Sequence, residues 1–202
     1  MSNKNKPLLL VISAPSGAGK SSLCNRLIEN VPGMVYSISC TTRPPRGAEQ
    51  NGVHYHFLSD AEFSARIAAG EFLEHALVHG NRYGTLKQTV VDALAQGRDI
   101  IMDIDVQGAD QIRRACAAMN DEDVIRRSFV DIFIAPPSME ELRRRLCGRA
   151  TDSAEVIEKR MLVAADEMKQ QADYQYVVIN DDFEKAADEL SAIIAREHHN
   201  RW

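Results

Sequence analysis

The sequence is poor in the residues that build disulfide scaffolds, metal cages and membrane spans. Its four cysteines are far apart and form no C-x-x-C pair, so we expect neither a disulfide framework nor a zinc site. Among the six histidines, His75 and His79 have the i, i+4 spacing of ligands on a helix, but Gly80 and the β-branched residues around them argue against a helix there, so we expect no histidine metal site. No apolar run approaches membrane-spanning length, and the N-terminal segment is polar rather than signal-like. These features predict a cytoplasmic protein with no membrane partner.

Positive charge is also in deficit. The net charge of −5 argues against a surface that binds duplex DNA or another nucleic acid polymer. Hydrophobic residues make up 45% of the chain and charged residues 26%, which is typical of a globular protein with a substantial core. A length of 202 residues exceeds one typical domain but falls short of two, which favours one core with an insertion.

The most informative stretch is residues 11–22, V-I-S-A-P-S-G-A-G-K-S-S. An apolar run at 8–12 predicts a buried strand, and a helical pattern begins near Ser21. Strand, glycine-rich turn and helix N-terminus together are the setting in which backbone N–H groups bind a polyphosphate. Lys20 would reach the β- and γ-phosphates, and the Ser21 hydroxyl would bind Mg²⁺. The predicted phosphate-binding set is Ala14, Pro15, Ser16, Gly17, Ala18, Gly19, Lys20, Ser21 and Ser22.

The loop departs from the usual pattern at one position, and it has an alternative interpretation. The usual pattern, G-x-x-x-x-G-K-[ST], begins with glycine, whereas this chain has Ala14 there. The alternative interpretation is a glycine-rich turn before an ordinary helix. The flanking strand and helix patterns favour the phosphate-binding loop.

Strand and helix patterns alternate along most of the chain. Strands are predicted at 8–12, 35–40, 99–105, 129–134 and 176–179. Helices are predicted between them, and this order indicates a parallel β-sheet with helices on both faces. We expect capping boxes at Ser59 and Ser138, and a helix capped by Asp152 with Glu155. A strand at 53–57 falls within a mixed α+β insertion at 39–85, and residues 120–128 are expected to form an exposed loop. The core would comprise 1–38 and 86–202.

Ligands of such sheets bind beyond the carboxyl ends of the strands. The phosphate-binding loop, two carboxylates (Asp103 and Asp105) and the pair Asn180-Asp181 all fall there. Asp103 and Asp105 are two residues apart on a predicted strand, so we expect them to face the same side. One of them would hold a water on Mg²⁺. Alternatively, both carboxylates only end the strand at the solvent.

A cluster of arginines follows the fourth predicted strand. On a helix only Arg145 and Arg149 share a face, whereas Arg143 and Arg144 point elsewhere. We interpret Arg145 and Arg149 as a pair directed at a nucleoside triphosphate, and the other two as solvated surface residues.

The motifs, in this order and spacing, resemble those of guanylate kinases of the bacterial type, which are P-loop nucleoside monophosphate kinases. They are A-P-S-G-A-G-K-S-S, S-C-T-T-R-P-P-R, G-x-x-Y, F-L-E-H-A, Y-G-T, D-I-D-V-Q-G, I-A-P-P-S, K-R-M and V-I-N-D-D, and they cover nearly the whole chain. The resemblance implies a P-loop kinase fold with a parallel β-sheet core flanked by helices. It also implies a small mixed α+β GMP-binding insertion and a short helical lid at about 138–165.

The resemblance further implies a reaction and the residues that perform it. The γ-phosphoryl of MgATP would pass to GMP, giving ADP and GDP, as in GMP recycling. The GMP phosphate would bind Arg43, Arg46, Tyr55 and Tyr83, and guanine would bind Ser39, Glu74, Thr85 and Asp103. Arg145, Asn180 and Asp181 would contact ATP together with the phosphate-binding loop. The catalytic set would be Lys20, Arg46, Arg149 and Arg160, and Mg²⁺ would be held by Ser21 and, through water, by Asp105.

The sequence departs from the family pattern at two places, and it is compatible with two rival functions. Ala150 follows Arg149 where relatives usually have glycine, and the segment at 114–128 is longer than in typical relatives. The rivals are another P-loop kinase acting on a small molecule, and a non-catalytic guanylate kinase-like binding module. The expected partners are ATP and GMP, and a homo-oligomer is compatible with the sequence.

Overall fold

The computed structural model describes residues 6–78, 80–148 and 153–200. Its larger sheet has five parallel strands in the order β2-β7-β1-β8-β9. Their bounds are β1 Leu9–Ser13, β2 Val35–Tyr36, β7 Ile100–Asp103, β8 Phe129–Ala135 and β9 Tyr176–Ile179. Strand β1 pairs with β7 and β8 on its two sides, so every residue of β1 is buried. This explains its continuous apolar sequence, because a central parallel strand contacts core on both faces.

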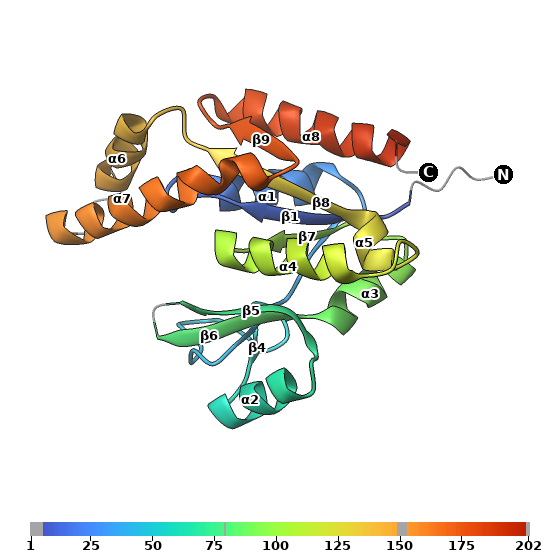
Figure 1. The fold of residues 1–202 in the computed structure, drawn as a ribbon. Coiled ribbons are helices and arrows are strands. Elements are labelled where there is room, and N and C mark those ends of the chain that lie inside the picture. The colour runs from blue at the N-terminus through green and yellow to red at the C-terminus, as the bar shows by residue number, and fades with distance from the viewer. Residues whose placement is uncertain (1–5, 79, 149–152, 201–202) are drawn as a thin grey trace.

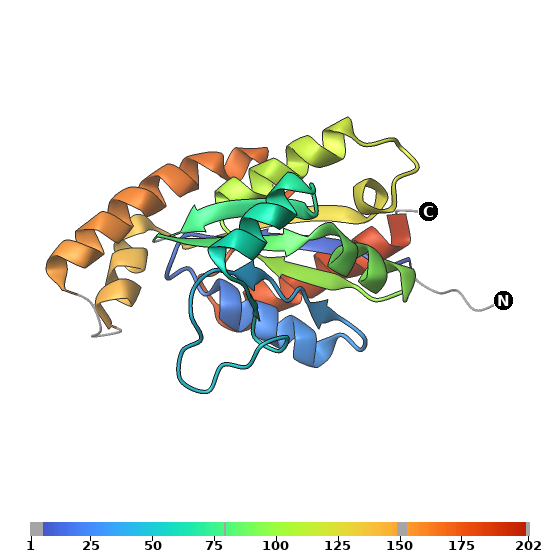
Figure 2. The same ribbon diagram turned by 90° about the horizontal axis from the view of Figure 1, so that it is seen from below.

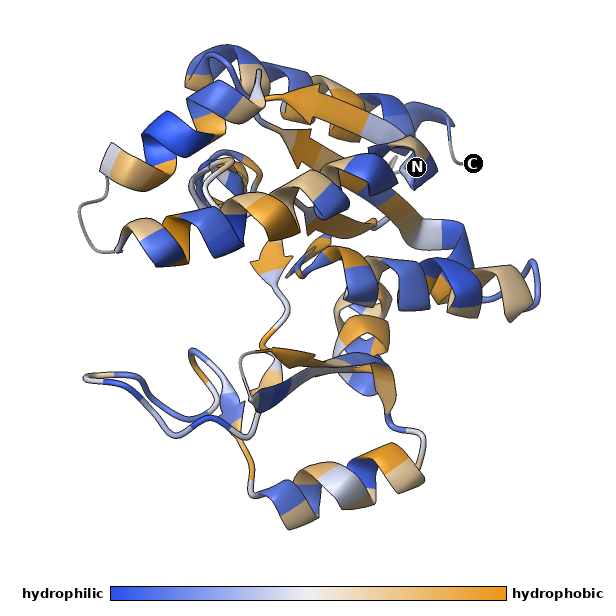
Figure 3. Cartoon of the chain, turned by 60° about the vertical axis from the view of Figure 1, so that its left-hand side comes forward, coloured by the Kyte–Doolittle hydropathy of each residue, from blue (hydrophilic) through white to orange (hydrophobic). Residues whose placement is uncertain are grey.

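Helices cover both faces of this sheet (Figure 1). Leu10 and Ile12 of β1 face a cluster that includes residues of α1 (Lys20–Asn30) and α8 (Phe183–Asn200). Leu9 and Val11 face the opposite cluster, with residues of α3 (Lys87–Ala95), α4 (Val106–Ala118) and α5 (Val124–Ser128). Successive side chains of a strand point to opposite faces, so one short strand serves both layers. Figure 3 shows the hydrophobic residues concentrated on the strands and on the helix faces turned toward them.

A smaller sheet is formed by the segment between β2 and α3. Its strand order is β4-β3-β6-β5. The bounds are β3 Cys40–Thr41, β4 His56–Phe57, β5 Phe72–Val78 and β6 Asn81–Leu86, and α2 (Asp60–Ala68) packs on this sheet. Its core is small: Phe63 stacks on Phe72 with ring centroids 4.4 Å apart, and Cys40 joins them. Figure 1 shows this sheet on the side of α4 away from β1, and in Figure 2, seen from below, it lies in front of the core sheet. Strand β5 contacts α4.

Two helices, α6 (Met139–Gly148) and α7 (Ala154–Lys169), project to one side of the core. They pack on each other through Leu142, Leu146 and Met161. Arg143 of α6 and Glu158 of α7 form an ion pair across this contact. A short 3-10 helix at Gln170–Asp173 leads back to β9.

The fold class predicted from the sequence is confirmed, and several local expectations need correction. The expected loop at 120–128 contains α5, which Asp123 caps and which buries Ile125 and Ser128. The polar residues around these two positions hid the helix. The strand expected at 53–57 is reduced to His56–Phe57, and the one at 35–40 is divided between β2 and β3.

Of the predicted helix caps, one is confirmed and another differs in the structure. The capping box at Ser59 and Glu62 is confirmed. Ser138 accepts from the Glu141 amide at 3.1 Å, but the Glu141 carboxylate turns to arginines instead of closing a box. Helix α7 is capped by Ser153, and Asp152 lies outside the described residues. Within the described ranges, no helix is long and apolar enough to cross a membrane.

Candidate active site

The loop between β1 and α1 is shaped by close approaches that only glycine allows. Gly17 and Gly19 both have φ +96, a left-handed conformation that glycine adopts without steric cost. A Cβ on Gly19 would lie 2.3 Å from the Asn180 amide nitrogen, and one on Gly17 would lie 2.9 Å from Leu146. Asn180 is buried and donates to the Ala18 carbonyl at 2.7 Å. Asn180, which was predicted to contact ATP, therefore packs against Gly19 and holds the loop through its hydrogen bond to Ala18.

The N-terminus of α1 is open to an anion. No side chain in the described ranges caps it, and its first turn contains no acidic residue. The first N–H groups of a helix have no partner within the helix, and the helix dipole makes this end positive. A cavity lies over this end, and it is lined by Ala14, Pro15, Ser16, Gly17, Gly19, Lys20, Ser21, Ser22, Asp103, Asp105 and Glu167. We refer to it as the loop cavity.

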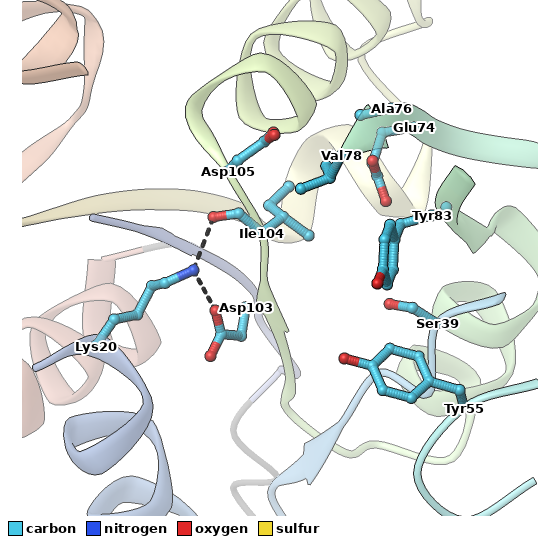
Figure 4. A pocket seen from close by; sticks show the side chains of 11 residues that line it. Lys20, Ser39, Tyr55, Glu74, Ala76, Val78, Tyr83, Asp103, Ile104 and Asp105 are labelled. Atoms are coloured by element: carbon cyan, nitrogen blue, oxygen red, sulfur yellow. Dashed lines mark hydrogen bonds and ion pairs between the residues drawn. The ribbon is translucent and has the colours of Figure 1, made fainter. Parts of the chain in front are cut away.

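Lys20 joins α1 to the end of β7. Its ammonium forms an ion pair with Asp103 and donates to the Ile104 carbonyl at 3.0 Å (Figure 4). The Ser21 hydroxyl donates to the same Asp103 carboxylate at 3.1 Å. Asp103, which the resemblance assigned to guanine, thus lies directly against the two residues predicted to serve phosphate and metal.

The expectation that Asp103 and Asp105 share one strand face is wrong. Strand β7 ends at Asp103, and Asp105 is the N-cap of α4, where its carboxylate accepts from the Gly108 amide at 2.8 Å. The sequence pattern D-x-x-G is compatible with either arrangement, because an Asx cap needs only a free amide three residues on. Both carboxylates nevertheless line the loop cavity.

A second cavity adjoins the first and faces the smaller sheet. It is lined by Lys20, Ser39, Tyr55, Glu74, Ala76, Val78, Tyr83, Gly84, Asp103, Ile104 and Asp105. We call it the sheet cavity. Figure 4 shows Lys20 and Asp103 on one side of it, with Ser39, Tyr55, Glu74 and Tyr83 opposite. Lys20, Asp103 and Asp105 belong to both linings, so the two cavities meet at these residues.

Glu74 is the most unusual carboxylate of the sheet cavity. Only 4% of it is exposed, and burial raises its pKa to about 7. The charge on Asp105 also raises this pKa, whereas hydrogen bonds from Thr85 favour the ionised form. Thr85 is fully buried, and its hydroxyl lies 3.3 Å from that of Ser39. Three of the predicted guanine-binding residues are therefore neighbours, while the fourth, Asp103, lies across the cavity.

The predicted phosphate-binding residues of the insertion form a second group. Arg43 makes a two-point ion pair with Glu49, with both N–O distances 2.9 Å, and its guanidinium lies 5.4 Å from the centroid of the Tyr55 ring. The Tyr55 and Tyr83 rings meet edge to face at 6.0 Å. Glu49 also accepts from the Arg46 backbone amide at 2.7 Å. The Arg46 side chain is exposed on the same loop.

Two carboxylates of the site were missed by sequence reasoning. Hydrogen bonds from the Arg43 guanidinium lower the pKa of Glu49 to about 2, so Glu49 is ionised at neutral pH beside the predicted phosphate site. Glu167 of α7 lines the loop cavity, and burial raises its pKa to about 7, with a smaller contribution from Asp105. Neither residue belongs to a recognisable motif. Glu49 lies on the same loop as Arg43 and Arg46, whereas Glu167 reaches the loop cavity from α7, a segment distant in sequence.

Neither described lid arginine, Arg145 or Arg160, is among the residues that line the two cavities. Arg145 donates to Glu141 at 2.8 Å on its own helix, and Arg160 is half-buried on α7. Arg149 and Ala150 lie outside the described residues. Asp181 is exposed after β9.

A parallel β-sheet flanked by helices, a glycine-rich loop after β1, a lysine at the first position of the following helix and an adjoining second cavity together define a P-loop kinase. The family profile described as guanylate kinase matches residues 6–197. The guanylate kinase of Dechloromonas aromatica is 48% identical over 92% of this chain and 87% of its own length. That of Myxococcus xanthus is 48% identical over 96% and 88%. The chain belongs to the guanylate kinase family, whose members are ATP:GMP phosphotransferases.

The fold agrees with a solved member of that family. The crystal structure of guanylate kinase from Anaplasma phagocytophilum is 34% identical and covers 96% of this chain and 87% of that chain, with a TM-score of 0.71.

Proposed function

We propose that the loop cavity binds ATP and the sheet cavity binds GMP, and that the γ-phosphoryl group passes between them to give ADP and GDP. The observation that carries this assignment is the shared wall: Lys20 and Asp103 belong to both linings. A phosphoryl group moving from one cavity to the other would pass Lys20. Direct transfer needs donor and acceptor side by side, because catalysis of phosphoryl transfer consists mostly of positioning and charge stabilisation.

The acceptor oxygen needs no general base in this proposal. A phosphate monoester has a second pKa of about 6, so the GMP phosphate is largely ionised at neutral pH. The residues expected to neutralise its charge are Arg43 and Arg46, with the Tyr55 and Tyr83 hydroxyls as further partners. Lys20 stabilises charge on the transferring group.

Glu74 supplies base selectivity in this proposal. Guanine presents two adjacent donors, N1–H and the exocyclic amine, and an ionised carboxylate accepts from both. Adenine has no donor at N1, so it would leave one carboxylate oxygen buried without a partner, which is costly. The Ser39 and Thr85 hydroxyls lie close by to complete the hydrogen bonding.

The oxygen donors at the loop cavity fit Mg²⁺. The Ser21 hydroxyl and the Asp103 carboxylate lie 3.1 Å apart, and Asp105 faces the same cavity. Hard oxygen ligands of this kind bind Mg²⁺ together with substrate phosphates, rather than as a complete protein cage. When bound, the ion neutralises charge on the ATP phosphates. We propose Ser21 as the direct ligand and Asp103 or Asp105 as the holder of a metal-bound water.

The predicted arginines of α6, α7 and the segment between them would act from the lid. We propose that α6 and α7 close over ATP and bring Arg145, Arg149 and Arg160 to the phosphates, which excludes water from the reaction. Asn180 and Asp181 would border the adenosine side of ATP.

A cytoplasmic location, as expected from the sequence, suits a substrate pair of free nucleotides.

A coupled assay of ADP release tests the proposal directly. GMP, AMP, CMP and UMP are offered in turn with MgATP, and we expect turnover of GMP alone at a substantial rate. Comparable turnover of AMP would contradict the role of Glu74 and favour a broader P-loop kinase. Absence of turnover with every acceptor, together with GMP binding by calorimetry, would favour the binding module.

A further inference from the structure

One side chain of the core, that of Gln111, forms hydrogen bonds with the edge of the smaller sheet. Strand β5 is the last strand of this sheet within the described residues, so its outer N–H and C=O groups need partners other than a strand. Gln111 of α4 supplies them. Its Oε1 accepts from the His75 amide at 3.1 Å, and its Nε2 donates to the His75 carbonyl at 2.9 Å. The side-chain amide of Gln111 thus pairs with β5 as the peptide group of a neighbouring strand would.

The same face of α4 also determines where Glu74 can lie. Gly108 precedes Gln111 by one helical turn, so both positions face β5. A Cβ on Gly108 would lie 2.9 Å from Glu74 Oε2 and 3.2 Å from Ile104 Cδ1. The Glu74 carboxylate therefore packs directly against the backbone of α4. A side chain at position 108 would occupy the same space and displace it.

Helix α4 is itself held firmly on the core. Arg113 donates to the buried Asp131 of β8 at 2.9 Å, and the Arg113 guanidinium lies 4.5 Å from the Tyr174 ring centroid. At the start of the helix, Asp105 caps the Gly108 amide. Because α4 is fixed on the core sheet, its contacts with β5 also fix β5, the strand that contains Glu74, relative to the core sheet.

We propose that Gln111 and Gly108 are positioning residues for base recognition. Gln111 fixes the backbone of β5 against α4, and Gly108 leaves the space in which the adjacent Glu74 presents its carboxylate to the sheet cavity. Neither Gln111 nor Gly108 is among the described residues that line the two cavities. They act through Glu74 and do not touch the substrate. The inference rests on the proposed GMP site.

The first test replaces Gln111 by methionine, which keeps the length of the side chain and removes both hydrogen bonds. Two neutral hydrogen bonds correspond to about a tenfold effect, so we expect KM for GMP to rise about tenfold. We expect KM for ATP to stay within about twofold, because that cavity is held by α1 and the core sheet. Discrimination between GMP and AMP should fall together with GMP affinity. The matched control is Arg114→Met on the same helix, where the side chain is 80% exposed.

The second variant, Gly108→Ala, separates positioning from stability. Alanine is the best helix former, so this change should leave the thermal midpoint unchanged or raise it. The added methyl group should nevertheless displace Glu74 and raise KM for GMP at least as much as Gln111→Met does. A rise in KM without loss of stability is a result that a merely structural role of α4 does not produce.

The outcomes separate this inference from the proposed function. If the unsubstituted protein turns over GMP and both variants keep its KM and its discrimination against AMP, the positioning role is overturned. Equal increases in KM for GMP and ATP, or a lowered thermal midpoint as the only effect, also overturn it. If the unsubstituted protein neither turns over GMP nor binds it in calorimetry, the proposed function fails and the inference fails with it.

Discussion

The two cavities are built in different ways, although they share a wall. The loop cavity is lined mainly by one continuous segment, residues 14–22, which directly follows the fully buried β1, and Asp103, Asp105 and Glu167 complete the lining. The sheet cavity collects residues from α1, β5, β6 and β7 and from the loops before β3, before β4 and after β7. The small sheet behind it has a core of only a few residues. The loop cavity depends mainly on the geometry of the backbone, and the sheet cavity depends on the geometry of side chains. We therefore expect substitutions at the first to affect the reaction itself, and those at the second to affect mainly the choice and affinity of the acceptor.

The largest effect is expected at the shared lysine. Lys20→Met removes the only cation known to face both cavities among the described lining residues. We expect kcat to fall on the order of 10³-fold, judged from the contribution of a positioned cation in phosphoryl transfer. The measurement is steady-state ADP release with saturating ATP and GMP. Lys87→Met, at an exposed position of α3, is the control and should leave kcat unchanged. A loss of less than tenfold would contradict the central role of Lys20.

Glu74→Gln should affect the acceptor alone. The amide keeps the size of the side chain but replaces one acceptor oxygen by a donor, which then opposes a donor of guanine. We expect kcat/KM for GMP to fall on the order of 10²-fold, because the buried polar groups are left mispaired. KM for ATP should be nearly unchanged and serves as the internal control. If both KM values rise together, the division between the two cavities is wrong.

The raised pKa of Glu74 makes a separate prediction about stability. Its pKa is 4.5 in the unfolded chain and about 7 in the folded protein. The folded state therefore holds the proton more tightly, so ionisation of Glu74 costs stability as the pH rises from about 4.5 to about 7. Glu74→Gln removes this cost. The variant should gain on the unsubstituted protein by up to about 3 kcal/mol in free energy of unfolding across this window.

The measurement is urea unfolding at pH values from 4 to 8. The difference between variant and unsubstituted protein should be small below pH 4.5, should grow through the window and should level off above about pH 7. A difference independent of pH would mean that Glu74 is ionised without penalty. GMP affinity should follow the opposite course and increase with pH, because guanine binds the ionised carboxylate.

The phosphate-binding loop was the part of the site most predictable from sequence. Its signal is local, since strand, glycines and helix start follow one another within a few residues. Even the departure at Ala14 has a simple explanation: its methyl group is buried in the core cluster between α1 and α8. The strands of the core sheet were equally visible, because each is an apolar run that the core must bury.

Other features depend on contacts between distant segments, which no local pattern contains. Glu167 reaches the loop cavity from α7, and the need for glycine at position 108 follows from a carboxylate that belongs to β5. Asp105 shows a third case, in which the sequence allowed both a strand end and a helix cap. The structure selects the cap, because the chain turns into α4 directly after Ile104.

The smallest expected effect concerns Glu49, which supports the acceptor site from within its loop. Its carboxylate holds Arg43 by two hydrogen bonds and the Arg46 amide by a third. Because this ion pair is partly exposed, Glu49→Gln should raise KM for GMP only about threefold to fivefold. The cause would be a less fixed Arg43, so KM for ATP should not change. The pKa of Glu49 is held at about 2, so the effect should be constant from pH 6 to pH 8.

The matched control is Glu71→Gln, which breaks another arginine pair of the small sheet, with Arg66, away from both cavities. Glu71→Gln should leave KM for GMP unchanged. Equal KM values in the two variants would show that Glu49 is only a surface charge. A lower KM in Glu49→Gln would show that its carboxylate competes with the phosphate for Arg43 instead of positioning it. Either result would mean that the acceptor phosphate site is not preformed in the structure. The difference from the phosphate-binding loop, which is preformed, would then be larger.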